Sequence, residues 1–148
     1  MSIAVKICGL STSESVRATA EAGADWIGFN FVDGSPRYID PSSMAELMPH
    51  IGASEAVGLL VDPEDAFVDR VLGTGVRTIQ LHGEEPPERV SELARRVPGE
   101  VWKAIGVATR DDLKQANEYS SADRLLIDAR RNADRLPDLP GNAPCKLR

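Results

Sequence analysis

Cysteine and histidine are scarce in this sequence, and their scarcity argues against several kinds of site. The 148 residues include two cysteines, Cys8 and Cys145, and two histidines, His50 and His82. A small secreted domain held together by disulfides carries more cysteine in a shorter chain. No two of these four residues have the spacing of a zinc-binding motif. We therefore expect neither a disulfide framework nor a bound metal ion.

Basic clusters and long apolar runs are also missing. The net charge is −6, and the best candidate for a basic cluster is the pair Arg130-Arg131 in an expected loop, whereas proteins that bind the phosphate backbone of nucleic acids cluster Lys and Arg. No apolar run approaches the roughly 20 residues of a membrane-spanning helix. The N-terminus MSIAVKICGL lacks the basic start and long apolar stretch of a signal peptide. We expect a cytoplasmic protein that binds neither nucleic acid nor membrane.

The chain does contain a series of short apolar segments, several of them rich in Val and Ile. Segments of this length and composition are typical of strands that are buried on both faces, as in parallel sheets. The expected strands cover residues 3–7, 26–31, 56–61, 78–81, 101–105 and 125–127.

Helix signals stand between these strands. Ser11 and Glu14 have the spacing of a capping box, and Gly23 suits the left-handed turn that ends a helix. Asp40 and Asp62 each precede a proline and are expected helix N-caps. Strand and helix therefore alternate, which predicts a parallel α/β fold. Further helices are expected over residues 67–72 and 84–96 and after residue 109.

Polar residues on the strands favour a barrel over an open sheet. Lys6 and Cys8 share one face of the first strand, and Gln80 and His82 share one face of the fourth. Lys103 stands in the middle of the fifth strand, and we expect it to point inward as well. Polar groups inside a parallel sheet are costly unless they face a shared polar interior, which a barrel provides. We predict a partial (βα)-barrel over residues 1–129 and an irregular segment over residues 130–148.

A polar residue also stands near the end of most expected strands, where barrel enzymes hold their active sites. Cys8 and Asp128 would make a base and acid pair if the two strands face one cavity. Each side chain also has a structural alternative. A free cysteine is more often a small buried hydrophobe, Asp128 suits a strand-end turn, and Arg37 and His82 suit ordinary loop positions. The strand-end residues are Cys8, Asn30, Asp62, His82 and Asp128.

Six segments together resemble the phosphoribosylanthranilate isomerase family. The match runs from residue 3 to about residue 129, and the KICG and GFNF…SPRY elements are specific to that family. The resemblance implies an eight-unit (βα)8 TIM barrel and an Amadori rearrangement in tryptophan biosynthesis, in which phosphoribosylanthranilate becomes the corresponding ketosamine without cofactor or metal. The segments, in order, are VKICGL, EAGADWIGFNFVDGSPRYI, VGLLVDP, IQLHGEE, VWKAIGV and RLLIDA.

The resemblance also implies a role for individual residues. Cys8 of KICG falls at the position of the general base that removes the C2 proton of the substrate. Asp128 of LLIDA falls at the position of the general acid that protonates the furanose ring oxygen. Arg37 of SPRY and His82 of QLHG fall where the family contacts the anthranilate end, and a guanidinium pairs well with a carboxylate.

The chain also departs from the family pattern. We expect six strands rather than eight, and the glycine-rich loops that hold the substrate phosphate in the family have no counterpart, so no phosphate-binding residue is assigned. A frameshift or premature stop near Pro140 would explain such a sequence. We expect a chain that is inactive by itself and that associates through the edges of its first and sixth strands. The alternatives are a non-catalytic fragment that serves as an interaction half-barrel, and another sugar-phosphate barrel enzyme such as an epimerase, which the specific motifs disfavour.

Overall fold

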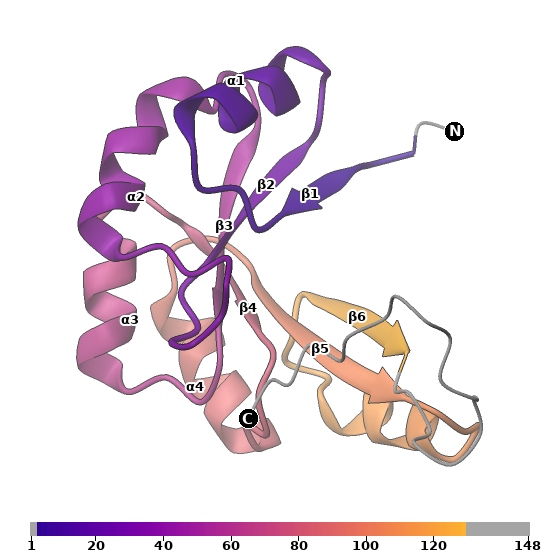
Figure 1. The fold of residues 1–148 in the computed structure, drawn as a ribbon. Coiled ribbons are helices and arrows are strands. Elements are labelled where there is room, and N and C mark those ends of the chain that lie inside the picture. The colour runs from indigo at the N-terminus through magenta and orange to yellow at the C-terminus, as the bar shows by residue number, and fades with distance from the viewer. Residues whose placement is uncertain (1–2, 130–148) are drawn as a thin grey trace.

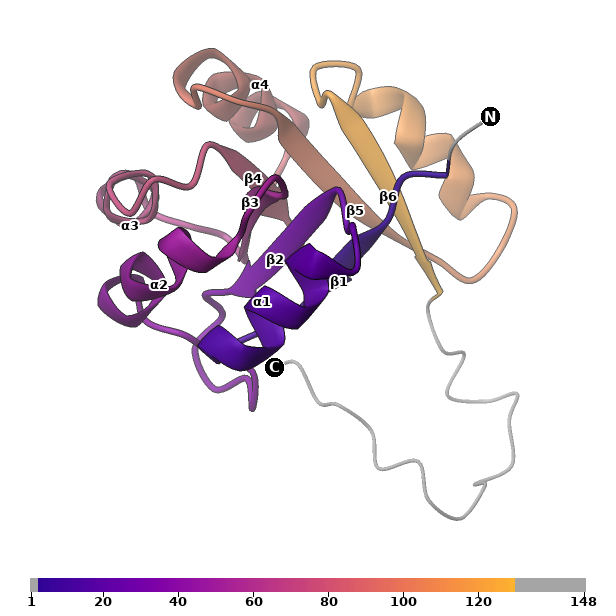
Figure 2. The same ribbon diagram turned by 90° about the horizontal axis from the view of Figure 1, so that it is seen from above.

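The computed structural model describes residues 3–129, so the predicted irregular segment over residues 130–148 lies outside the described residues. Six parallel strands form one sheet in the order of the chain, β1-β2-β3-β4-β5-β6. The sheet curves into a half-barrel, and the helices lie on its outer side (Figures 1 and 2). The predicted parallel α/β architecture is therefore confirmed. The strands are β1 (Lys6–Cys8), β2 (Trp26–Asn30), β3 (Glu55–Leu60), β4 (Thr78–Leu81), β5 (Val101–Val107) and β6 (Arg124–Ala129).

Short helices connect the strands, and their caps agree only in part with the predicted ones. Asp40 is an N-cap as expected, since its side chain accepts hydrogen bonds from the backbone of Ser42 and Ser43. The first helix is capped by Thr12 rather than by Ser11. Gly23 takes the predicted left-handed conformation, with φ of 82°. The helical elements are α1 (Ser13–Glu21), α2 (Pro41–Leu47), η1 (Met48–His50), α3 (Asp65–Leu72), α4 (Pro87–Arg96) and η2 (Asp112–Glu118), of which η1 and η2 are 3₁₀ helices.

Asp62 is not the N-cap of α3, contrary to the prediction. The cap position belongs to Glu64, and no side chain caps this helix. The backbone of Asp62 is left-handed, with φ of 42°, and its carboxylate accepts a hydrogen bond from the backbone N–H of Glu84 at 3.1 Å. The carboxylate therefore binds the loop after β4 instead of the helix that follows it in sequence.

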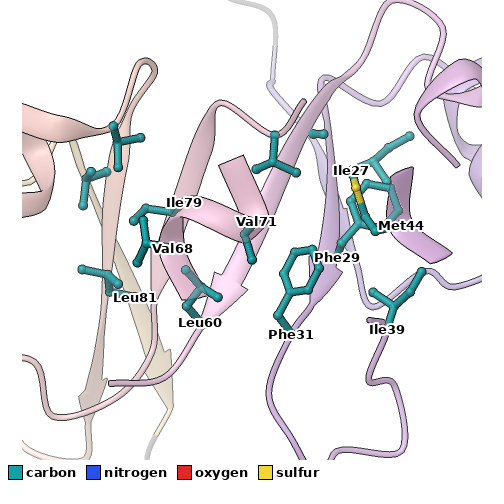
Figure 3. Close-up of a cluster of buried hydrophobic side chains, with 14 of the residues drawn as sticks. Ile27, Phe29, Phe31, Ile39, Met44, Leu60, Val68, Val71, Ile79 and Leu81 are labelled. Atoms are coloured by element: carbon teal, nitrogen blue, oxygen red, sulfur yellow. The ribbon is translucent and has the colours of Figure 1, made fainter. Parts of the chain in front are cut away.

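The apolar core lies between the sheet and its helices (Figure 3). Successive side chains of a strand point to opposite faces, and Ile27 and Phe29 of β2 pack outward against Met44 of α2. Val68 and Val71 of α3 are fully buried in the same cluster. The other set of strand residues faces the interior of the half-barrel, where the candidate site residues Cys8 and Asp128 lie.

Lys103 belongs to the outward-facing set, so the prediction that it points inward is wrong. Its register partner on β4 is Leu81, which is part of the outer core. The inward residue of β5 is its neighbour Trp102, whose ring lies 5.2 Å from that of Trp26. The ammonium of Lys103 is compensated on the outer side by the carboxylate of Glu85 at 2.8 Å, which allows a charge to lie at a buried position.

Ion pairs join α3 to α4 on the surface. Asp65 lies 2.6 Å from Arg89 and 2.8 Å from Arg96, and Arg96 also pairs with Asp69 at 2.6 Å. The hydrogen bond from Arg89 lowers the pKa of Asp65 below its ordinary value of 3.8. This network connects two consecutive helices across their exposed sides.

Asp65→Asn should destabilise the protein more at neutral pH than at pH 3. A carboxyl whose pKa is lowered by folding stabilises the protein above its ordinary pKa, and this stabilisation is lost as the pH falls through the folded pKa. Urea unfolding at pH 7 and at pH 3 measures the difference between the variant and the wild type. Asp111→Asn, which removes an exposed pair with Lys114, is the control and should change stability little at either pH. An equal loss for Asp65→Asn at both pH values would contradict this assignment.

Candidate active site

A cavity of about 490 Å³ opens at the carboxyl ends of the strands. Because all six strands run in the same direction, these ends meet at one rim of the half-barrel. The four residues that the sequence analysis singled out for the site all line this cavity. They are Cys8, Arg37, His82 and Asp128.

Two glycines make room for the first two of these side chains. A Cβ atom at Gly28 would lie 2.6 Å from the Sγ atom of Cys8, so the thiol occupies space that only glycine leaves free. A Cβ atom at Gly9 would lie 2.5 Å from Cδ of Arg37, and Gly9 also has a φ of 81°. The KICG and GFNF elements therefore fit together at the point where β1 meets β2.

Asn30, at the end of β2, holds the loop that carries Arg37. Its amide oxygen accepts from the backbone of Val32 at 2.8 Å, and its amide nitrogen donates to the hydroxyl of Ser35 at 2.9 Å. The same hydroxyl accepts from the backbone N–H of Arg37 at 3.2 Å. Asn30 thus orients the loop, a role that its place at the end of a strand did not reveal by itself.

A row of polar side chains crosses the interior from β1 to β6. Lys6 donates to the amide oxygen of Gln80 at 2.6 Å, which turns the amide nitrogen of Gln80 toward Nδ1 of His82 at 3.4 Å. Because this nitrogen donates, neutral His82 accepts at Nδ1 and carries its proton on Nε2. Nε2 lies 3.3 Å from Oδ2 of Asp128. The Nε2–H group of His82, at the end of this row, is therefore a donor toward the carboxylate of Asp128.

The two tryptophans lie at the opposite end of the interior, near the starts of the strands. Their rings meet edge to face at an interplanar angle of 81°. The guanidinium of Arg124 lies 4.7 Å from the ring centroid of Trp26, and Glu100 accepts from both Arg124 and the indole N–H of Trp102. These residues fill the base of the half-barrel and leave the cavity open at the other end.

Within residues 3–129, no group of three or more His, Cys, Asp and Glu side chains comes close enough together to hold a metal ion. Nor does any helix of that part of the chain have the length and apolar character needed to cross a membrane.

A model of the protein family described as "N-(5'phosphoribosyl)anthranilate (PRA) isomerase" matches residues 5–134. The chain belongs to this family. Among curated relatives, the N-(5'-phosphoribosyl)anthranilate isomerase of Zymomonas mobilis subsp. mobilis is 43% identical over 133 residues, which are 88% of this chain and 63% of the relative. That of Paracoccus denitrificans is 44% identical over 95% of this chain and 66% of its own length.

Solved structures of PRA isomerases have the same fold. The enzyme of Thermotoga maritima superposes with a TM-score of 0.82 at 32% identity, covering 89% of this chain and 64% of that one. A PRA isomerase in complex with reduced 1-(o-carboxyphenylamino)-1-deoxyribulose 5-phosphate gives a TM-score of 0.80 at 33% identity, covering 87% and 66%. The chain thus spans about two thirds or slightly less of the relatives that it matches, and the family and the barrel fold predicted from the sequence motifs are confirmed.

The catalytic and binding roles of the four cavity residues stay predictions. The likeness of the fold to PRA isomerases and the position of the four residues on one cavity do not test these roles. The structure adds Lys6, Gln80 and Asn30 to the site of this PRA isomerase homologue. The sequence placed Lys6 and Gln80 on inward faces, which was the available signal, but their mutual hydrogen bond joins residues that are distant in the chain.

Gly28→Ala should destabilise the protein by about 1–3 kcal/mol, because an added methyl group collides with a well-packed neighbour. In the Cys8→Ala background the cost should be smaller, since the contact with sulfur is gone, and only the contacts with backbone and Cβ of residue 8 at 3.2 Å remain. Urea unfolding of the two single variants and the double variant measures this coupling. Gly28→Ala combined with Leu113→Ala, on η2, should be additive. Equal costs of Gly28→Ala with and without the thiol would show that Cys8 does not lie over Gly28.

Proposed function

We propose that this chain carries the acid–base centre of a PRA isomerase, which converts N-(5'-phosphoribosyl)anthranilate to the corresponding ketosamine. The observation that carries the proposal is the placement of Cys8 and Asp128 on the same cavity, from the first and the sixth strand. Membership of the family supports it. The substrate is a small molecule, and a cavity of about 490 Å³ is within the usual size of small-molecule sites.

The reaction needs one acid and one base. As a carboxylic acid, Asp128 gives a proton to the furanose ring oxygen while the C1–O bond breaks, and the amine lone pair forms an iminium at C1. As a thiolate, Cys8 then removes the C2 proton, and the electrons of the C–H bond form a C1–C2 double bond as the nitrogen becomes neutral. The resulting enolamine becomes the ketosamine when the C2 hydroxyl loses its proton and C1 gains one.

Arg37 and His82 serve binding and orientation in this proposal. Arg37 lies on the cavity wall and offers a planar pair of donors to the anthranilate carboxylate. His82 donates to Asp128 from Nε2 and holds the carboxyl group toward the cavity. No residue is assigned to the substrate phosphate.

We also place this activity in the cytoplasm. The proposed base is a free thiol, and free thiols persist in reducing compartments.

Residues 1–148 expressed alone should not support growth of a tryptophan auxotroph that lacks this isomerase. The phosphate is remote from the reacting atoms, and such groups supply binding energy that positions the reacting centre. Positioning can lower a barrier by about 7–11 kcal/mol. A chimera joined after Ala129 to the last third of the Paracoccus denitrificans relative should restore growth. Growth with residues 1–148 alone would contradict this expectation.

In the same chimera, Cys8→Ala and Asp128→Asn should each lower kcat by about 10²-fold or more, the usual effect of an acid–base group. The loss of substrate fluorescence on conversion measures the rate. His50→Gln is a matched control, because His50 lies in η1 and does not line the cavity. Near-normal kcat in either Cys8→Ala or Asp128→Asn would remove that residue from the mechanism.

A non-catalytic interaction half-barrel is the second candidate function, and the edges of the sheet favour it. At the two edges of the sheet, large apolar side chains remain 39–56% exposed, namely Val5, which precedes β1, Ile7 of β1, and Leu125 and Ile127 of β6. Val5 and Ile7 line an apolar groove together with Ala18 of α1 and with Ala22, which follows the last residue of that helix. Exposed edge strands with such side chains invite pairing with another chain.

We therefore expect residues 1–148 to self-associate. Sedimentation velocity should show species larger than a monomer that increase with concentration, and Ile7→Lys with Ile127→Lys should reduce them, because charges on an edge strand oppose pairing. Val61→Lys, at an exposed apolar residue that follows the central strand β3, should not. A compact monomer that melts cooperatively at all concentrations would contradict this expectation.

A further inference from the structure

Glu85 and Lys103 form a buried ion pair that the proposed reaction does not use. The side chain of Glu85 is 1% exposed and that of Lys103 is 3% exposed, and Nζ of Lys103 lies 2.8 Å from Oε2 of Glu85. The pair lies on the outer side of β5, where the ring of Tyr119, the residue that follows η2, covers it at 5.5 Å from Nζ. The hydroxyl of Tyr119 also donates to the backbone carbonyl of Glu85.

The hydrogen bonds of this pair join the loops that follow β3 and β4. The carboxylate of Glu85 accepts from the backbone N–H of Asp62 at 2.8 Å and from that of Gly83 at 3.0 Å. Lys103 donates to the backbone carbonyl of Gly83 at 2.7 Å. Both backbone polar groups of Gly83 are therefore bound by this one ion pair.

The two loops also touch directly at this point. A Cβ atom at Gly83 would lie 2.7 Å from the carboxylate of Asp62, so the contact needs glycine. The left-handed backbone of Asp62 directs that carboxylate to the N–H of Glu84. Asp62 thus binds the loop that follows His82, a structural role that replaces the helix-capping role predicted for it.

His82 lies immediately before the bound residue Gly83. Its own backbone N–H donates to the carbonyl of Leu60 on β3 at 2.9 Å. Hydrogen bonds therefore fix the backbone on both sides of His82. They thereby set the direction of its Cα–Cβ bond, and so the position of the imidazole ring. The carboxylate of Asp128 is 62% exposed and lies 3.3 Å from that imidazole, so its orientation depends on where the ring is held.

We propose that Glu85 and Lys103 are positioning residues that hold His82, and through it Asp128, in place at the cavity. The part that concerns Asp128 as the acid rests on the function proposed above. A buried ion pair adds little net stability to a protein, because a protein with an apolar pair of similar volume in its place is often as stable or more stable. What the ion pair supplies, and an apolar pair would not, is directed hydrogen bonds to both sides of Gly83.

The test uses the two histidines of the chain as reporters. NMR spectra of residues 1–148 labelled at the imidazole nitrogens give one set of signals for His82 and one for His50. Asp128→Asn should shift the His82 signals in the wild type, because it changes the group that Nε2 contacts. In Glu85→Gln with Lys103→Met, which removes both buried charges together, this shift should be lost. This readout does not need enzymatic activity, so it separates this inference from the proposed function.

Controls distinguish positioning from a general loss of structure. Glu100→Gln breaks hydrogen bonds at the opposite end of β5 and should leave the response of His82 to Asp128→Asn intact even if it lowers stability. The His50 signals should not change in any variant. Thermal unfolding shows whether each variant folds.

Glu85→Asp provides a second test that keeps the charge opposite Lys103 but withdraws the carboxylate by one methylene group from Asp62 and Gly83. It should also abolish the response, and it decides the matter if the double variant does not fold. Carbethoxylation of His82, compared with that of His50, measures the same response at micromolar protein concentration. A His82 response to Asp128→Asn as large in the folded variants as in the wild type would overturn the proposal.

Discussion

The alternation of side chains along six parallel strands is the constraint on which the rest of this structure depends. On each strand one set of residues packs outward under the helices, as Ile27 and Phe29 do, and the other set faces the interior, as Trp26 and Gly28 do. Because every strand runs in the same direction, the inward residues at the strand ends gather at one rim. Residues from the first and the sixth strand thereby reach the same cavity.

This arrangement places charged and polar groups inside the half-barrel, where each needs a partner. Burying a polar group without a hydrogen-bond partner costs about 1–3 kcal/mol in mutational data. In the part of the chain that the structure describes, no buried side-chain nitrogen or oxygen atom lacks a hydrogen-bond partner. Lys6 and Gln80 satisfy each other near the cavity, and Glu100 and Arg124 do so at the base.

Much of the fold could be predicted from the sequence, because apolar segments of strand length are a local signal. The strand over Thr78–Leu81 agrees with its prediction at both ends. The first strand begins later than predicted, at Lys6, because the backbone N–H of Val5 donates to the side chain of Asp25 and its carbonyl accepts from the backbone of both Asp25 and Trp26, which departs from the ladder of a regular strand pair. Lys103 was assigned to the wrong face because both of its neighbours are apolar, so the local pattern does not define the face.

The cavity residues were reached mainly through family motifs, and the structure brings all four to one place. The residues that orient them were harder to predict, because their partners are distant in sequence. In QLHGEE two glutamates follow one another, and nothing local indicates that it is Glu85 that is buried on the outer side of the sheet and accepts hydrogen bonds from Asp62 and Gly83. The interactions of Asn30 with its own loop are shorter in range, and the place of Asn30 at a strand end was the only sequence signal for them.

The tryptophan pair at the base of the half-barrel has a spectroscopic consequence. Trp26 and Trp102 are the two tryptophans of the chain, and they meet at 5.2 Å although they belong to β2 and β5. All tryptophan emission therefore originates at one point, where strands far apart in sequence come together beside the guanidinium of Arg124. During refolding, the native emission can arise only after the sheet has curved, so fluorescence follows long-range assembly while far-ultraviolet circular dichroism follows the helices that form locally.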